Sequence, residues 1–577
     1  MRNTIASVHL LRALVPAALA ALLVLAGRAE VPAQEGGGSP MSSEGVVPPP
    51  AGTDIETLRK LLGLPSMAPA TAPAKPADQK PAPAVKAAEP PAPAVEAEKP
   101  SAPVPAPAPA VKAPAKPKPP IAKPVPKKPA KPVVKSAPKA TPVPEAPPAD
   151  APPDEAPVAD APAAKVVKEP SASVQGSMED VPPAGTVVSS ANMERWKHLL
   201  GPSIQWAVSR GATLPVIDPT PAPLEPFREA ATKQYSSQVS LAPDKNSMRN
   251  YVAGIPFPLV TDDDPDVAIK MMFNFESRLA VDDATVRNFS CDTGSIDPQR
   301  GLETERHYVI DSFRRLFYVS RFHFDPKPTW KTSEGVRYRE MLGPLLEPFD
   351  LKGAGFTYIR YLNPAQHDDS WIYFPQFKRV RRLSTAQRSE GVFGQDIDLD
   401  SYAGYAGNPA WSNWTYLGKK TVLGVMHARN LPSRFQKSPV DFFPDDVWEP
   451  REVYVLLAVS RLGGYNFGQR VLYLDRESLF IPYTEIYDLK GSLWKGLVQT
   501  WKFGREPIPN SKRARYDYDQ FFIPALSMFD IQNNHVTRCQ FPSPDEKGEE
   551  GWYFNVGTAE GTTEEVFSVS KFIEGGR

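Results

Sequence analysis

Apolar and polar residues alternate along much of the C-terminal two thirds of the chain, which predicts a domain built from β-strands. The predicted strands are residues 356–362, 371–383, 452–459, 470–474, 479–487 and 493–503. Turn sequences such as Gly463-Gly464 and residues 488–492 separate the later strands, so neighbouring strands are expected to pair as an antiparallel meander. A sheet of about eight or more strands twists and tends to curl into a barrel or half-barrel.

One helix interrupts this pattern of strands. Asp264 is a preferred N-cap residue, and Pro265 suits the first helical position. The apolar residues that follow share one helical stripe: Val267, Ala268, Met271 and Met272. A helix is therefore predicted from residue 264 onward.

The first third of the chain has the opposite composition. About half of the 68 prolines lie between Pro65 and Pro183, and the first aromatic residue is Trp196. Proline fixes φ and removes a backbone donor, so this stretch favours polyproline II over helix or sheet. We therefore predict a disordered Pro/Ala/Lys-rich spacer over residues 65–188 and an aromatic-rich β domain over residues 189–577.

The N-terminus has the pattern of an export signal. A basic region precedes an uninterrupted apolar run from Ala13 to Gly27, which is shorter than the ~20 residues of a membrane-spanning helix. Residues 1–33 are predicted to be a signal peptide, with retention as an uncleaved membrane anchor as the alternative. No cysteine directly follows the apolar run, which excludes a lipid-modified N-terminus. In either case the rest of the chain is exported.

A short repeat flanks the spacer. Residues 54–63, in a tail over residues 34–64, align without gaps on residues 192–201, and both copies end in Leu-Leu-Gly. Each copy begins with an N-cap residue and has the pattern of a short amphipathic helix. Such a helix is marginal alone in water, so the first copy is expected to need a partner surface. Coincidence between two ten-residue segments is the alternative.

The only two cysteines, Cys291 and Cys539, both lie in the predicted β domain. An even number of cysteines in an exported protein favours a disulfide. Two unpaired thiols are the alternative, because the sequence does not show whether the two Cα atoms approach each other.

Composition and motifs give no sign of catalysis. The chain has 66 Lys and Arg against 66 Asp and Glu, which argues against a nucleic-acid binder. Zinc motifs, a nucleophile elbow and a phosphate loop are all absent from the sequence, so neither an enzyme nor a metal or other cofactor is expected. Asp396, Asp398 and Asp400 are expected to project from a surface strand rather than to form a calcium loop.

Several longer motifs resemble the family called domain of unknown function 1329. They lie at residues 251–258, 368–375, 379–383, 394–396, 470–475 and 482–495, and the resemblance covers about residues 221–544. It implies a fold related to the LolA and LolB lipoprotein carriers, a strongly bent antiparallel sheet that forms an unclosed half-barrel with a few helices. No catalytic or ligand-binding residues follow from it.

The resemblance also implies a function. We expect a non-enzymatic protein of the Gram-negative periplasm, with or without attachment to the outer membrane, that holds or passes on a lipid or other hydrophobic molecule. The implied partners are a transporter of the resistance-nodulation-division type and an outer-membrane protein. The alternative is an envelope-spanning scaffold whose β body is fully packed.

Two groups of residues are candidates for a binding site. Aromatic side chains with one polar end suit the mouth of an apolar cavity, and the ligand-binding residues chosen on this basis are Trp371, Tyr373, Tyr473, Tyr483 and Trp494. The choice assumes which face of the sheet is concave, and the sequence leaves that open. Arg379, Arg381 and Arg382 are candidates for contact with a lipid headgroup or an acidic partner, the alternative being a solvated strand edge.

Overall fold

The computed structural model describes residues 180–383, 388–504, 519–544, 551–557 and 562–575, together with Arg59, Leu62 and Leu64. The predicted signal peptide and spacer lie outside the described residues, except for the spacer's last few positions. Within the part that is described, no helix is both long and apolar enough to cross a membrane.

One antiparallel sheet of 15 strands dominates the β body. Its strands are β5 (Asp283–Asp297), β6 (Gly301–Phe317), β7 (Val336–Leu342), β8 (Leu345–Glu347), β9 (Gly355–Tyr361), β10 (Asp369–Phe374), β11 (Arg379–Arg382), β12 (Ser412–Gly424), β13 (Glu449–Ser460), β14 (Gln469–Asp475), β15 (Tyr483–Tyr487), β16 (Leu493–Gly504), β17 (Gln520–Asp530), β18 (His535–Gln540) and β19 (Trp552–Phe554). The predicted mainly β class with a large antiparallel sheet is confirmed.

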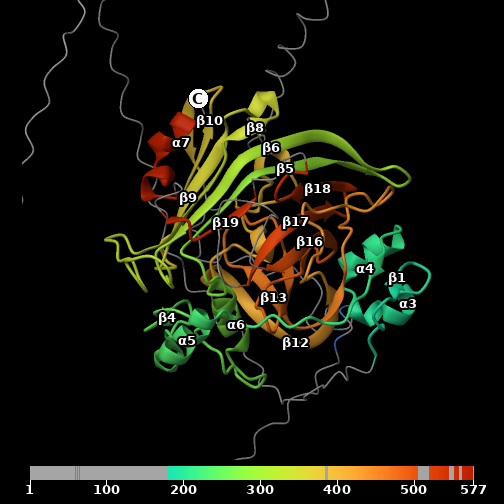
Figure 1. Ribbon diagram of the computed structural model, residues 1–577, viewed down its shortest axis with the longest axis horizontal. Helices are drawn as coiled ribbons and strands as arrows, with labels where there is room; N and C mark the ends of the chain where they lie inside the picture. Colours follow the sequence, from blue (N-terminus) through green and yellow to red (C-terminus); the bar gives the residue numbers. More distant parts are fainter. Residues whose placement is uncertain are drawn as a thin grey trace, which may run out of the picture. The chain divides into compact units, whose positions relative to one another are not determined.

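The sheet is a meander with one long crossing. The strand order is β11-β10-β9-β7-β6-β5-β18-β17-β16-β15-β14-β13-β12, with β8 beside β6 and β19 beside β5. The chain thus enters at β5, runs outward to the edge strand β11, crosses to the other edge at β12 and returns to β18, next to β5. No pairing joins β11 to β12 among the described strands, so the sheet is open. Figure 1 shows β5 and β6 as long curved strands above β16, β17 and β18.

The helices are short and lie at the faces of the sheet. They are α3 (Met193–Trp196), α4 (Pro202–Ser209), α5 (Pro226–Tyr235), α6 (Val267–Glu276) and α7 (Val569–Gly575). Two small two-stranded sheets are formed by β1 (Val187–Val188) with β2 (Leu214–Pro215) and by β3 (Ser240–Leu241) with β4 (Met248–Arg249). The helix predicted from residue 264 is α6, but its N-cap is Asp266, so Asp264 and Pro265 lie in the preceding turn.

Two helices cover opposite faces of the strands from β12 to β14. Alternate residues such as Val455 and Tyr473 pack in the cluster that contains α4, whereas Leu456 and Leu472 pack in the cluster that contains α6. Because successive side chains of a strand point to opposite faces, these strands are buried on both sides. Figure 1 shows α4 and α6 on either side of β12 and β13.

Backbone conformation moves two of the predicted strand boundaries. Residues 371–383 form two strands rather than one, since the chain turns back between Phe374 and Arg379 with Lys378 at φ 48°. Likewise β15 begins only at Tyr483, because Leu479 has φ 64°, a left-handed conformation that a strand cannot contain.

A disulfide joins Cys291 of β5 to Cys539 of β18. The two residues are register partners in these paired strands, with Cα atoms 4.1 Å apart. The bond therefore connects β5, the first strand of this sheet along the chain, to β18, the strand with which the chain returns to it.

Candidate ligand-binding cavity

The segment that carries the chain from β11 to β12 forms one wall of the candidate site. We call its residues 388–411 the crossing segment. Hydrogen bonds fix it to widely separated strands: the Tyr308 hydroxyl of β6 donates to the Phe393 carbonyl at 2.8 Å, and the Lys495 ammonium of β16 donates to the Asp396 carbonyl at 2.9 Å. The crossing segment therefore lies over the face of the sheet opposite to the one that α4 covers.

Buried ion pairs hold the crossing segment in place. Arg388 lies between Asp368 and Asp400, with nitrogen–oxygen distances of 2.8 and 2.6 Å, and the guanidinium of Arg360 is bonded to Asp368 at 2.6 Å. All four side chains are nearly inaccessible to solvent. A charge buried in this way is tolerated only when it is paired and hydrogen-bonded, so the network specifies one position for the segment.

The expectation that Asp396, Asp398 and Asp400 project from a surface strand is wrong. Their exposed fractions are 7%, 0% and 2%, and they lie in the crossing segment outside the strands of the main sheet. Each carboxylate has a partner that makes burial possible, because Asp396 binds His535 at 2.8 Å and the other two bind buried arginines. Burial raises the pKa of Asp398, while the nearby Arg470 charge acts in the opposite direction.

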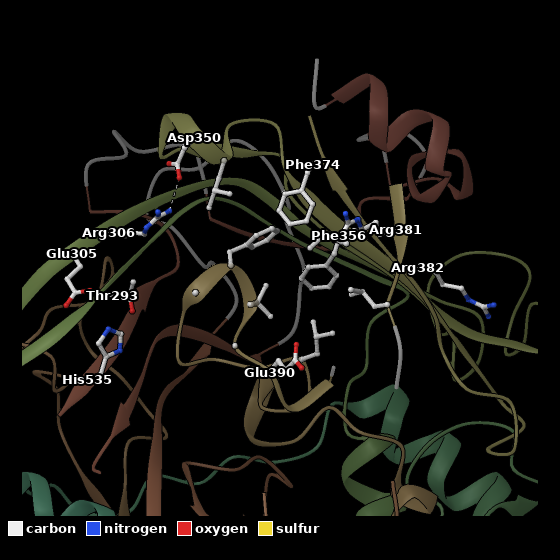
Figure 2. Close-up of a pocket in the computed structure, with 18 residues that line it drawn as sticks. Thr293, Glu305, Arg306, Asp350, Phe356, Phe374, Arg381, Arg382, Glu390 and His535 are labelled. Atoms are coloured by element: carbon white, nitrogen blue, oxygen red, sulfur yellow. Dashed lines mark hydrogen bonds and ion pairs between the residues drawn. The ribbon is translucent and has the colours of Figure 1, made fainter. Parts of the chain in front are cut away.

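A cavity of about 960 Å³ lies between the crossing segment and the strands β9 to β11. Its apolar wall is formed by Leu351, Phe356, Ile372, Phe374, Leu383, Val392, Phe393 and Leu399. Phe356 and Leu399 are nearly fully buried, whereas Arg306, Arg381 and Arg382 at the rim are exposed. Figure 2 shows Phe356 and Phe374 near the middle of the wall, with Arg381 beside them. The cavity thus has an apolar interior and a charged mouth.

Strand register decides which aromatic residues reach the cavity. In β10, Ile372 and Phe374 line it, so Trp371 and Tyr373 point to the opposite face. Phe356 of β9 is the register partner of Ile372, and Arg381 of β11 is its partner on the other side. One row across three strands therefore places an aromatic, an aliphatic and a cationic side chain next to one another.

The charged groups at the mouth differ in how they are paired. Arg306 is bonded to Asp350 at 3.0 Å, as Figure 2 shows, and Arg382 is paired with Asp369. Arg381 has no carboxylate within ion-pair distance among the described residues. His535, at the other end of the cavity, has a pKa raised above its usual value, first because its ring is hydrogen-bonded to Asp396.

The structure does not bring the five aromatic candidates together. Tyr373 packs in a cluster on the far side of β10, and Trp494 packs against Phe467 with ring centroids 5.5 Å apart. Tyr473 and Tyr483 are 0% exposed on the face that α4 covers, with their ring centroids 4.4 Å apart. The Tyr473 hydroxyl donates to the buried carboxylate of Glu485 at 3.0 Å. None of the five lines this cavity: Tyr373, Tyr473 and Tyr483 pack in other clusters, whereas Trp494 packs in the cluster that contains Phe356 and Ile372.

The three arginine candidates all lie on one strand at the edge of the sheet. All three belong to the edge strand β11 and are exposed, and Arg381 and Arg382 line the cavity while Arg379 does not. The apolar wall, by contrast, was missed. Alternation in residues 371–375 does separate Ile372 and Phe374 from their neighbours, and this is the signal that could have found them. Val392 and Phe393 lie in a single 3-10 turn (Val392–Gly394) and Leu399 lies in a turn, and neither carries a periodic signal.

No group of three or more His, Cys, Asp or Glu side chains in the described part of the chain could hold a metal ion.

Comparisons with known proteins identify a family. A family model described as a protein of unknown function, DUF1329, matches residues 187–568, and no curated protein matches the chain. Among solved structures, the chain is similar to one described as a putative outer membrane lipoprotein-sorting protein domain from Vibrio parahaemolyticus. The two sequences are 14% identical, the match covers 53% of this chain and 98% of that chain, and the TM-score is 0.34.

Two further solved structures are similar to this chain. One is a DUF1329 family protein from Desulfovibrio piger, with 13% identity, 52% and 96% of the two chains covered, and a TM-score of 0.33. The other is a LolA superfamily protein from Nitrosomonas europaea, with 13% identity, 52% and 94% covered, and a TM-score of 0.29. The family model extends beyond both ends of the motifs found in the sequence and covers more than half of the chain, so this protein belongs to the DUF1329 family.

Proposed function

We propose that this protein is a non-enzymatic binding protein of the cell envelope that holds a lipid or another amphiphile in the cavity under the crossing segment. The observation that carries the proposal is the cavity itself, which combines an apolar wall with Arg381 at its mouth. A volume of about 960 Å³ lies within the range of roughly 300–1,000 Å³ that is common for small-molecule sites.

The apolar wall would supply most of the binding free energy. Burial of ~400 Å² of acyl chain at ~25 cal/mol/Å² contributes ~10 kcal/mol before the costs of ordering and association are subtracted. The alkyl part of the ligand would lie against Phe356, Ile372 and Phe374, where water would otherwise cover exposed apolar surface. Such a ligand would be retained without any covalent step.

The charged mouth would orient the ligand. Arg381 is exposed and has no described carboxylate partner, so its guanidinium is available to an acidic headgroup. Arg382 is already paired with Asp369, and Arg379 lies outside the cavity lining. We therefore assign Arg381 the main headgroup contact and the other two arginines a weaker electrostatic contribution.

The wider setting is also part of the proposal. The export signal in the sequence supports a place in the periplasm of a Gram-negative bacterium, where a soluble binding site would carry a hydrophobic molecule through water. A transporter of the resistance-nodulation-division type and an outer-membrane protein would supply or receive the ligand. The alternative function, a scaffold with a fully packed body, is disfavoured because the cavity would leave apolar surface uncovered.

Native mass spectrometry of protein purified from its own envelope tests the proposal. We expect a co-purifying amphiphile that is lost in Phe374→Asp, since a carboxylate on the wall would face the alkyl chain without a partner. Phe377→Asp is the matched control: it lies in the same hairpin, its ring contacts that of Phe374 at 6.3 Å, and it is 61% exposed outside the lining. A wild-type protein without any bound amphiphile, or equal retention by both variants, would contradict the proposal.

A further inference from the structure

Three residues from before the spacer lie in the core of the β body. Arg59, Leu62 and Leu64 have exposed fractions of 6%, 1% and 6%, and more than 100 residues separate them from Asp180, where the continuous description begins. Leu62 and Leu64 belong to the same apolar cluster as Leu200 and Val455. The family resemblance does not include this part of the chain, and the ligand cavity does not use it.

Polar contacts fix these residues to the edge strand β12. The guanidinium of Arg59 donates to the carbonyl of Leu417, and the ammonium of Lys420 donates to the carbonyl of Leu62. Cations bind well to the free carbonyls at the end of a helix, because the helix dipole is negative there. The Leu62 carbonyl thus meets a half-buried lysine that belongs to the body.

The backbone of this segment ends as a helix commonly ends. The amide of Leu64 donates to the carbonyl of Arg59 at 2.8 Å, a bond that spans five residues. This is the outer bond of a Schellman motif, which has glycine as its most common residue at the position before the donor. That position is Gly63 in the sequence. This bond holds Arg59 and Leu64 together where both residues are buried in the body.

The second copy of the repeat ends in the same place. Leu200, which aligns with Leu62, is likewise 1% exposed in the same cluster. A Cβ atom on Gly201 would lie 2.6 Å from a carboxylate oxygen of Glu485, so only glycine permits the close approach. The amide of Ser203 then donates to Glu485 at 2.9 Å.

One site of the β body, which we call the docking pocket, therefore receives Leu62 of the first copy and Leu200 of the second. Lys420 binds the end of the first copy, Glu485 binds the chain directly after the second, and the two charges attract each other inside the pocket. The repeat found in the sequence thus corresponds to two adjacent docking positions on one surface.

We propose that the segment containing Arg59, Leu62 and Leu64 is a docking peptide that binds this pocket in cis. The occupant is the chain's own segment rather than that of a second copy. A spacer of over 100 residues can span the body at ~3.1 Å per residue, and a tethered segment has a higher effective concentration than a free one.

The proposal does not depend on the ligand cavity, which lies on the other face of the sheet from α4.

A cleavable spacer in the full-length chain tests the proposal. A specific protease site is inserted between Pro103 and Val104, and the cleaved protein is passed over a size-exclusion column with each fragment detected separately. We expect the N-terminal fragment to elute with the body. Its separation from the body directly after cleavage of the wild-type chain would overturn the proposal.

Two variants and a control locate the contact. We expect Leu62→Asp to weaken retention of the fragment by at least about thirtyfold, the fold-change typical for loss of a buried leucine. Leu64→Asp should also weaken it, because Leu64 is buried in the same apolar cluster, while Val104→Asp in the spacer should have no effect. Circular dichroism of each variant checks that the body remains folded. Equal retention by Leu62→Asp and Val104→Asp, or elution of the uncleaved chain as a dimer with exchanged segments, would contradict docking in cis.

Discussion

Cys291 and Cys539 lie directly opposite each other in β5 and β18 and are joined by a disulfide across the seam where the two halves of the sheet meet. The strands on one side of this seam follow β5 in the chain, and those on the other side precede β18. The bond therefore links the half that ends at β11, where the candidate cavity lies, to the half that carries the docking pocket.

Reduction of this disulfide should lower the melting temperature of the protein. The bond closes a loop with a sequence separation of 248 residues, and the chain-entropy model assigns to such a loop about 5 kcal/mol of stabilisation through the unfolded state. Thermal unfolding with and without reductant measures the effect, and the double variant Cys291→Ala with Cys539→Ala should match the reduced protein. Rapid labelling of both thiols in freshly isolated, folded protein would contradict the bond.

Removal of Arg381 should weaken binding of an acidic amphiphile. The side chain is exposed, so the loss expected for Arg381→Gln is modest, about threefold to tenfold, and smaller at high salt. Arg379→Gln on the same strand is the matched control, because its side chain does not line the cavity. Displacement of a fluorescent fatty acid, measured by titration at two salt concentrations, distinguishes the two variants. An equal effect of both would indicate general attraction by the strand edge rather than a headgroup contact.

Arg388→Met should destabilise the body far more than a change at the rim. Without Arg388, the carboxylates of Asp368 and Asp400 lose a partner inside the protein, and breaking a buried pair in this way costs roughly 3–5 kcal/mol. The exposed pair of Arg382 with Asp369 is the comparison, since Arg382→Met should cost at most about 1 kcal/mol. Urea unfolding followed by tryptophan fluorescence gives both free energies, and similar values for the two variants would show that the buried network is not decisive.

The sequence predicted the sheet because its strands carry local signals. The strand pattern in residues 452–459 and 493–503 corresponds to β13 and β16, and the motifs identified the family correctly. Periodicity divides a strand into two faces but does not say which face meets a cavity. Trp371 and Tyr373 were chosen for this reason, although the structure places Ile372 and Phe374 at the wall.

Long-range pairing explains most of what the sequence did not show. From the local sequence alone, Asp398 is expected to be a surface carboxylate. In the structure, the crossing segment places it beside Arg470, which lies far along the chain. Lys420 and Leu62 meet across 358 positions, and no local pattern links them. Only the repeat around Leu62 and Leu200 hinted at a shared surface, because two similar amphipathic ends suggest similar contacts.

Lys420 should make docking of the N-terminal segment sensitive to pH. Burial lowers the pKa of Lys420 from 10.5 to about 8, and the charge of Glu485 opposes this shift only in part. The protonated lysine is therefore disfavoured in the docked state relative to an exposed lysine. The resulting penalty is present in full below pH 8 and is relieved as the pH rises from 8 toward 10.5. Docking should become stronger with rising pH.

The other groups that face this pocket do not change the sign. Burial raises the pKa of Glu485, and it raises the pKa values of its hydroxyl partners Tyr473 and Tyr487 well above 10, so the tyrosines stay neutral as the pH is raised to 9. Arg59 keeps its charge throughout because a guanidinium does not titrate in this range. Lys420 is thus the group near this pocket whose protonation determines how docking depends on pH between 7 and 9.

The pH dependence can be measured on the spacer-cleaved protein as the dissociation constant of the N-terminal fragment. Between pH 7 and pH 9 the affinity should rise by up to about tenfold, the limit that linkage sets if release of the segment exposes Lys420 and returns its pKa from about 8 to 10.5. Lys420→Met is the control, since it removes the titrating group and should bind with an affinity that is independent of pH over this interval. A wild-type affinity that falls with rising pH would show that the ammonium form is the one that docking requires, and that its bond to the Leu62 carbonyl outweighs the cost of burying the charge.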